Sequence, residues 1–235
     1  MKKLFVLFAF FVINRGYSQN VIMKETIDTT KKVEAVGPNR KHFGHLITAY
    51  GFGIQSNNTE YTIKPFGSGN YFLGYRNKQR INKTFAYGFS IAYNYRNFHL
   101  LPKLTDTLPG PFRFDKESIK FNNIYFDLYQ RINYGRRGNS LGKFIDVGFY
   151  GEYAFSTVYS VKHNLPANNN MQANKVALKY KNLNYLNPFN YGLTLRIGFD
   201  KYVFFGNYRI SNCVKGNTVM KELPRISAGV EIAMY

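Results

Sequence analysis

The amino-acid sequence predicts an all-β protein, an eight-stranded antiparallel transmembrane β-barrel of the outer-membrane type that follows a cleaved signal peptide. Three observations lead to this fold class. Apolar residues alternate with small or polar residues at a period of two through much of the 235-residue chain. Two such runs meet at residues 200–201, and a tight turn there would place the apolar residues of both runs on the same face, as in a hairpin. The connections between runs are alternately short and long, as in outer-membrane barrels.

The most regular hairpin lies in residues 189–210. One face of this stretch is aromatic and aliphatic, and a two-residue break falls at 200–201. A tight turn at this break pairs Phe199 with Tyr202, so the apolar sets of both strands fall on one face. The opposite face carries Gly, Asn, Thr and Arg, which suit a narrow polar interior. The apolar face then needs an apolar solvent, and a bilayer accepts strands when they form a closed barrel.

The N-terminus has the pattern of a secretory signal. Lys2 and Lys3 precede the ten apolar residues 4–13, and small residues stand at the cleavage positions 16–18. Ten apolar residues are too few for a helix that spans a bilayer. We therefore predict three segments: a signal peptide at 1–18, a flexible periplasmic leader at 19–41 and an outer-membrane β-barrel at 42–235.

Charge and composition narrow the function classes. The net charge of +19 falls to +16 when residues 1–18 are removed, because Lys2, Lys3 and Arg15 leave and no acid does. The remaining basic residues are scattered over loops and turns, so we expect no nucleic-acid partner and instead a basic rim that faces lipid phosphates. Cys213 is the single cysteine, which excludes an intrachain disulfide.

Eight runs of alternation are assigned to strands of about ten residues, the length that a tilted strand needs to cross a bilayer. They lie at 45–55, 70–76, 85–96, 123–132, 145–155, 189–199, 202–210 and 225–235. The expected outside loops are 57–68, 103–118, 162–187 and 212–224, and the expected periplasmic turns are 77–83, 135–142 and 200–201. An even strand count places both termini on the periplasmic side.

The predicted inward face contains five cations and four anions. These are Arg76, Arg96, Asp127, Arg131, Asp146, Glu152, Arg196, Arg209 and Glu231. An eight-stranded barrel has an interior just wide enough for side chains to fill. Buried charges persist mainly when they are paired, so we predict a structural plug of paired polar side chains. A charged conduction path is the alternative.

The last third of the chain carries motif-level likeness to a known family. The runs 191–198, 208–212 and 222–232 resemble the small outer-membrane β-barrel, or PorT-like, family of Gram-negative bacteria, and the earlier strands match it in pattern alone. The resemblance implies a cell outer membrane location and a role near protein secretion. One departure concerns the terminal aromatic residue. Tyr235 shares parity with the inward Glu231, so either a bulge shifts the strand end or the assembly signal is atypical.

Enzymatic motifs are weak in this sequence. Residues 209–212 stand where some lipid A deacylases carry His-x-Ser-Asn, but Arg209 replaces the histidine and cannot act as a base. His42 and His45 lack a third metal ligand and are interpreted as polar residues of the periplasmic rim. We therefore expect no catalytic residue, no metal and no cofactor.

These expectations define one function and two alternatives. The first is a non-enzymatic, monomeric outer-membrane barrel with a side-chain-filled interior. Such a barrel would act as a structural or partner-binding component of the envelope, in contact with membrane lipid, lipopolysaccharide and envelope proteins. The first alternative is a narrow porin-like conduit for small solutes, and the second is a lipid-modifying outer-membrane enzyme.

Overall fold

The structure is a computed structural model that describes residues 37–56, 60–101, 115–134, 140–164, 175–216 and 221–235. The predicted signal peptide and most of the predicted leader lie outside the described residues. The described part of the chain is all-β, with two short 3-10 turns, η1 (Gly37–Asn39) and η2 (Pro65–Gly67), and no α-helix. Within η1, Pro38 is buried and its carbonyl accepts a hydrogen bond from the Lys78 ammonium.

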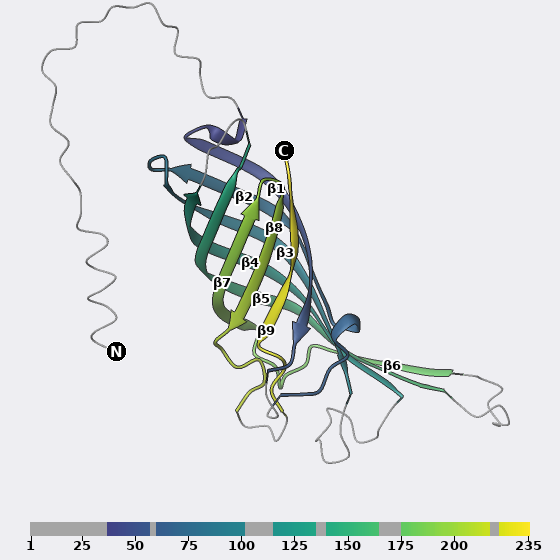
Figure 1. The fold of residues 1–235 in the computed structure, drawn as a ribbon. Coiled ribbons are helices and arrows are strands. Elements are labelled where there is room, and N and C mark those ends of the chain that lie inside the picture. Colours follow the sequence, from purple (N-terminus) through teal and green to yellow (C-terminus); the bar gives the residue numbers. More distant parts are fainter. Residues whose placement is uncertain (1–36, 57–59, 102–114, 135–139, 165–174, 217–220) are drawn as a thin grey trace, which may run out of the picture. The chain divides into compact units, whose positions relative to one another are not determined.

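Eight antiparallel strands form a closed ring (Figure 1). They are β1 (His42–Ile54), β2 (Gly69–Arg80), β3 (Phe85–Leu100), β4 (Lys116–Tyr134), β5 (Lys143–Asn164), β7 (Phe189–Phe199), β8 (Tyr202–Arg209) and β9 (Ile226–Met234). Each strand pairs with the next one in this order, and β9 pairs back with β1 from Leu46–Met234 to Ile54–Ile226. The predicted all-β fold with a ring-closed antiparallel sheet is therefore confirmed.

The β7–β8 hairpin has the predicted register. Phe199 pairs with Tyr202 across a two-residue turn. Asp200 adopts a positive φ of 57°, a left-handed conformation that Asp tolerates better than most residues. The burial pattern of β7 alternates without a break, so its apolar side chains face outward and its small and polar ones face inward.

The structure corrects the predicted loops where strands extend further than the alternation indicated. Residues 77–80 of the predicted turn 77–83 belong to β2, and residues 116–118 of the predicted loop 103–118 belong to β4. The predicted loop 162–187 contains the end of β5 and a ninth strand, β6 (Lys175–Lys181). Lysine is depleted in strands, so β6, with three lysines among its seven residues, lacks the composition of a strand although it pairs as one.

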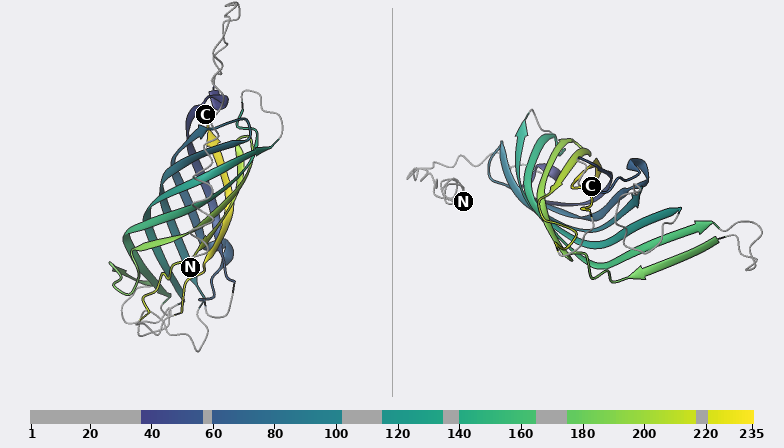
Figure 2. Two further views of the ribbon diagram at one scale, coloured as in Figure 1. Left: turned by 90° about the vertical axis from the view of Figure 1, so that its left-hand side faces the viewer. Right: turned by 90° about the horizontal axis from the view of Figure 1, so that it is seen from below.

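β6 belongs to a short sheet that leaves the ring. A bulge shifts the β4–β5 register, because Asn122 pairs with Ser156 while Asn123 pairs with Ala154. Before the bulge β5 pairs with β7, and after it Val158 to Asn164 pair with β6. We call residues 116–122, 156–164 and 175–181 the flap. Figures 1 and 2 show the β5–β6 end of the flap projecting sideways from the end of the barrel.

The connections sort into two ends of the ring, as predicted. At the turn end, the Asp200 amide donates to the Gly142 carbonyl at 2.9 Å, and the Tyr235 hydroxyl donates to the Asp200 carboxylate. At the long-loop end, the Tyr61 amide donates to the Glu222 carbonyl at 2.8 Å. No pairing between the described residues joins the 200–201 turn to the long-loop end.

The two faces of the ring differ sharply in chemistry. Its exposed large apolar side chains range from 37% exposure for Ile197 to 64% for Phe149, and they are distributed over all eight strands. Most charged side chains at the inward positions of the same strands are buried. The fold therefore has an apolar outside and a polar inside, the reverse of a water-soluble domain.

Candidate functional site: the charged barrel interior

All nine charged residues assigned to the interior from the sequence are buried, at 8% exposure or less. The alternation of each strand brings them there, since inward positions recur every second residue. The pairing order of the ring then decides which of them meet. They form four compact ion-pair groups stacked along the barrel, and one of these groups also recruits a residue from a loop.

The first group lies on the turn-end side of the barrel middle and contains two arginines. Nη1 and Nη2 of Arg76 both donate to the Glu231 carboxylate, and the Nη2–Oε2 bond measures 2.8 Å. Arg196 donates to the Asp127 carboxylate, and its Nε lies 3.9 Å from Glu231 Oε2. Glu231 therefore faces both arginines, and the two acids balance the two cations.

The second group is the Arg131–Asp146 pair. Arg131 Nε donates to Asp146 Oδ1 at 2.7 Å, and Nη2 donates to Oδ2 at 2.8 Å. Both side chains are fully buried. The guanidinium lies 3.4 Å from the centroid of the buried Phe144 ring, a cation–π contact between two buried side chains. This pair closes the interior just above the turn end.

Tyr129 connects the first two groups. The guanidinium carbons of Arg131, Arg76 and Arg196 lie 5.5, 5.6 and 5.9 Å from its ring centroid. Its hydroxyl donates to the Asn77 carbonyl at 2.8 Å. One aromatic ring thus separates three like charges and keeps each beside its own carboxylate.

The third group lies on the long-loop side of the barrel middle. Arg96 donates to both carboxylate oxygens of Glu152, at 2.9 and 2.8 Å. Asn94 Nδ2 donates to the same carboxylate at 3.1 Å. This bidentate geometry is the strongest form of arginine–carboxylate contact.

An aromatic layer separates this group from the two below it. The layer consists of Ala49, Phe72, Ala92, Tyr125, Tyr150 and Phe205. Phe72 packs edge-on against Tyr125 and Phe205, with ring centroids 5.2 and 5.6 Å apart. The two described cavities on either side of this layer measure about 10 Å³ each, room for a single water molecule at most. Neither of these two cavities has room for a small solute.

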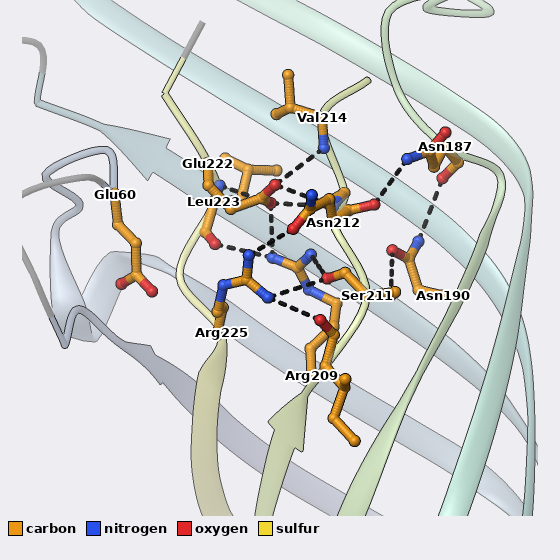
Figure 3. A network of polar contacts seen from close by, with 12 residues as sticks. Glu60, Asn187, Asn190, Arg209, Ser211, Asn212, Val214, Glu222, Leu223 and Arg225 are labelled. Atoms are coloured by element: carbon orange, nitrogen blue, oxygen red, sulfur yellow. Dashed lines mark hydrogen bonds and ion pairs between the residues drawn. The ribbon is translucent and has the colours of Figure 1, made fainter. Parts of the chain in front are cut away.

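The fourth group closes the long-loop end (Figure 3). Arg209 Nη2 donates to Glu222 Oε1 at 2.9 Å and to the Leu223 carbonyl at 2.8 Å. The Glu222 carboxylate also accepts the amides of Cys213 and Val214, at 3.0 and 3.3 Å. Glu222 therefore folds the loop after β8 over the mouth of the barrel and supplies the counter-charge of Arg209.

A hydrophobic cap lies around this network. It contains Tyr61, Ile63, Phe98, Leu100, Ile119, Phe121, Ala154, Tyr159, Val161, Leu186, Cys213, Val214 and Leu223. Strand residues of β3, β4 and β5 supply one side of the cap, and connections before β2, before β7 and before β9 supply the other. The cap and the Arg209–Glu222 group together lie across this end of the interior.

Sequence reasoning missed four charged interior residues. Glu222, Glu117 and Glu60 fell in predicted loops, and Lys78 fell in a predicted turn. All are buried or half-buried, and Glu117 accepts the Tyr159 hydroxyl at 2.8 Å. The parity of β2 and β4, carried past the predicted strand ends, is the signal that would have found Lys78 and Glu117.

His45 is a correction of a different kind. It was predicted to lie on the rim, but it is 5% exposed and stacks on Phe43, with ring centroids 5.4 Å apart. β1 begins three residues before the predicted strand, which places His45 inside and opposite Arg76 in the register. His42, at the first position of β1, is exposed as expected for a rim residue.

The stretch 209–212 resembles a catalytic motif in sequence but forms structural contacts. The guanidinium of Arg209 is occupied by Glu222 and by backbone carbonyls. Ser211 Oγ donates to Asn190 Oδ1 at 3.0 Å and accepts the Tyr191 amide at 3.1 Å. Within the described ranges, no group of three or more His, Cys, Asp or Glu side chains could hold a metal ion.

The chain was compared with protein-family models and with curated proteins, and nothing matches. A helix long and apolar enough to span a membrane does not occur in the part of the chain that the structure describes.

Proposed function

We propose that this protein is an integral outer-membrane β-barrel whose interior is closed by its own side chains. It acts as a non-enzymatic structural or partner-binding component of the envelope. The observation that carries the proposal is the reversed polarity of the ring. Apolar side chains are exposed on all eight strands, while the nine charged residues assigned to the interior from the sequence are all buried. A closed sheet with an apolar exterior is the form in which strands can cross lipid, which supports the proposal.

The placement of aromatic residues on the outer face supports the same proposal. Tyr71, Tyr191 and Tyr208 lie toward the long-loop ends of their strands. Tyr87 and Tyr202 lie toward the turn ends, and the outward positions between the two ends carry both aliphatic and aromatic side chains, such as Ile91 and Phe204. Tyrosine rings gather at both membrane–water interfaces of outer-membrane barrels, because one end of the ring is apolar and the other is polar.

The secretory pattern of residues 1–18 supports export, and the PorT-like resemblance of the last third supports a role near protein secretion. We extend the proposal accordingly to a monomeric barrel in the cell outer membrane of a Gram-negative bacterium. Its partners are lipopolysaccharide, membrane lipid and envelope proteins that reach the long loops or the periplasmic turns.

The membrane location is tested by one substitution with a matched control. Leu195 lies near the middle of β7 and is 49% exposed, and Leu178 lies on β6 outside the ring and is 42% exposed. We expect Leu195→Arg to destabilise the protein in lipid vesicles by about 2–4 kcal/mol, the cost of arginine at the bilayer midplane. Leu178→Arg should change stability by less than about 0.5 kcal/mol.

Urea unfolding in phosphatidylcholine vesicles measures both values. Equal effects of the two substitutions would contradict a lipid-facing β7. The closed interior is tested separately by planar-bilayer recording. The two interior cavities of about 10 Å³ each have room for a single water molecule at most, so we expect the purified protein to show no steady single-channel current. Regular ohmic steps would refute the closed interior and favour the conduit alternative.

A further inference from the structure

A second concentration of charge lies outside the barrel interior, on the outer face of the flap. The antiparallel register places six lysines on this one face: Lys116, Lys120, Lys162, Lys175, Lys179 and Lys181. Small and uncharged residues stand between them, including Ser118, Val158, Ser160 and Ala177. No described residue on this face is acidic. We call these six residues the lysine face.

The opposite face of the flap determines which way the lysine face points. Ile119, Tyr159 and Val161 are buried in the hydrophobic cap. Glu117, on the same side, is buried against the Tyr159 hydroxyl. Turning the flap over would expose this apolar surface and bury lysines, so the lysine face must remain on the outside.

The lysine face carries an electrostatic cost within the described structure. Lys116 and Lys162 stand directly opposite each other across β4 and β5, a like-charge pair that destabilises a sheet. None of the six lysines forms an ion pair with a described carboxylate. Protection of a free sheet edge accounts for lysines on β6. It does not account for Lys116 and Lys120, which lie two strands away from that edge.

The position of the flap indicates what neutralises these charges. The lysine face continues the outward apolar face of β4 and β5, which ends at residues such as Ile124 and Tyr153. The β5–β6 end of the flap bends away from the barrel in both views (Figures 1 and 2). An outer face that bends outward turns toward the plane surrounding the barrel. If the apolar band lies in a bilayer, that plane holds the lipid headgroups.

We propose that the lysine face is a docking surface for the phosphate groups of anionic membrane lipids and holds the flap against the membrane beside the barrel. This inference rests on the proposed membrane location and adds a specific lipid-contacting surface to it. Lysine ammonium groups next to an anionic leaflet are attracted by its surface potential, and this attraction falls off within a Debye length. An extended face of six lysines matches a surface of many phosphates better than a single small anion.

The test inserts the full-length mature chain into two kinds of vesicle, phosphatidylcholine alone and phosphatidylcholine with 30% phosphatidylglycerol. Hydrogen exchange of residues 175–181 reports whether the flap is docked, and trypsin protection of the barrel strands reports insertion. We expect insertion in both vesicles and exchange on the order of tenfold slower in the anionic ones. High salt should remove this difference, because exposed charges are screened.

Three sets of variants separate charge on the flap from other causes. The test variant is Lys162→Gln/Lys179→Gln/Lys181→Gln. The first control replaces the same three lysines by Arg and so keeps the charge of the flap. The second control, Lys83→Gln/Lys143→Gln/Lys201→Gln, removes the same amount of charge at the turn end. The test variant should lose the slowing caused by anionic lipid, and both controls should keep it. Loss of trypsin protection in both vesicles would instead reject the membrane location itself.

Two probes distinguish the occupant of the surface. In phosphatidylcholine vesicles, neither inorganic phosphate nor a poly-glutamate peptide should slow exchange as anionic lipid does. Equal slowing by inorganic phosphate would identify a free-anion site, and equal slowing by poly-glutamate would identify a surface for acidic protein segments. Either result would overturn the lipid assignment. Insertion with identical exchange in both vesicles would overturn it as well.

Discussion

Removing one partner of the Arg131–Asp146 pair should be among the most damaging single changes in the barrel. Arg131→Ala deletes two charge-assisted hydrogen bonds, of 2.7 and 2.8 Å, and the guanidinium that covers the Phe144 ring. Asp146 would then be a fully buried carboxylate that has lost its bidentate partner. Breaking a buried pair in this way typically costs about 3–5 kcal/mol. We expect a value toward the upper end, since the lost side chain also leaves a cavity beside Phe144.

A double substitution shows whether the loss of stability arises from the unpaired carboxylate of Asp146. Replacing the pair by apolar side chains of similar size, Arg131→Met with Asp146→Leu, is expected to recover most of the stability, because neither charge then remains to be buried. Arg196 keeps Asp127 and Glu231 as its own counter-charges in this variant. The double variant therefore isolates the contribution of the pair.

Urea unfolding in lipid vesicles, followed by circular dichroism, measures the free energy of unfolding of both variants. Lys179→Ala is the control, because Lys179 is exposed on the flap and its loss should change stability by less than about 0.5 kcal/mol. A cost below about 1 kcal/mol for Arg131→Ala would refute a dry, closed interior. Such a result would mean that water reaches Asp146 and solvates it.

Two further predictions concern close packing at the two ends of the interior. A Cβ added at Gly198 would lie 2.2 Å from the buried Phe144 ring. Gly198→Ala should therefore lower the free energy of unfolding by about 1–3 kcal/mol in the same assay. Gly206→Ala is the control and should cost far less, because a Cβ at Gly206 would meet no atom within 4 Å. Similar costs for both would contradict the packing described here. Burial raises the pKa of the Cys213 thiol from 9.0 to about 11, so iodoacetamide should alkylate it about 100-fold more slowly at pH 8 than in the urea-unfolded chain. Equal rates in the two states would contradict its place in the cap.

The sequence allowed the ring to be predicted because strict alternation leaves little freedom in strand register. A one-residue slip of β7 would turn Arg196 toward the outside and Leu195 toward the interior. The same parity indicated which charged residues face inward. It could not indicate which arginine meets which acid, since that depends on the stagger between neighbouring strands.

The missed features have a common physical cause. Glu222 lies in a connection that has no regular period, and only the folded loop brings it to Arg209. β6 does alternate, with Val176, Leu178 and Tyr180 on one face, but its lysines gave it the composition of a loop. The alternation of apolar and polar residues therefore identified the strands of the ring, which bury one face. It failed for a polar segment that forms a strand because it pairs with a neighbouring strand.

The closure of β9 on β1 has a consequence for how the chain is assembled. Leu46 and Met234, which pair across the seam, lie near opposite ends of the sequence. Until β9 pairs with β1 the sheet therefore has two open edges, and open edges are templates for pairing with other chains. Closing so long a loop also makes folding slow. The state most exposed to aggregation is consequently the one in which β9 has not yet paired with β1. A chaperone that covers the edges of β1 and β8 would protect the chain at that stage.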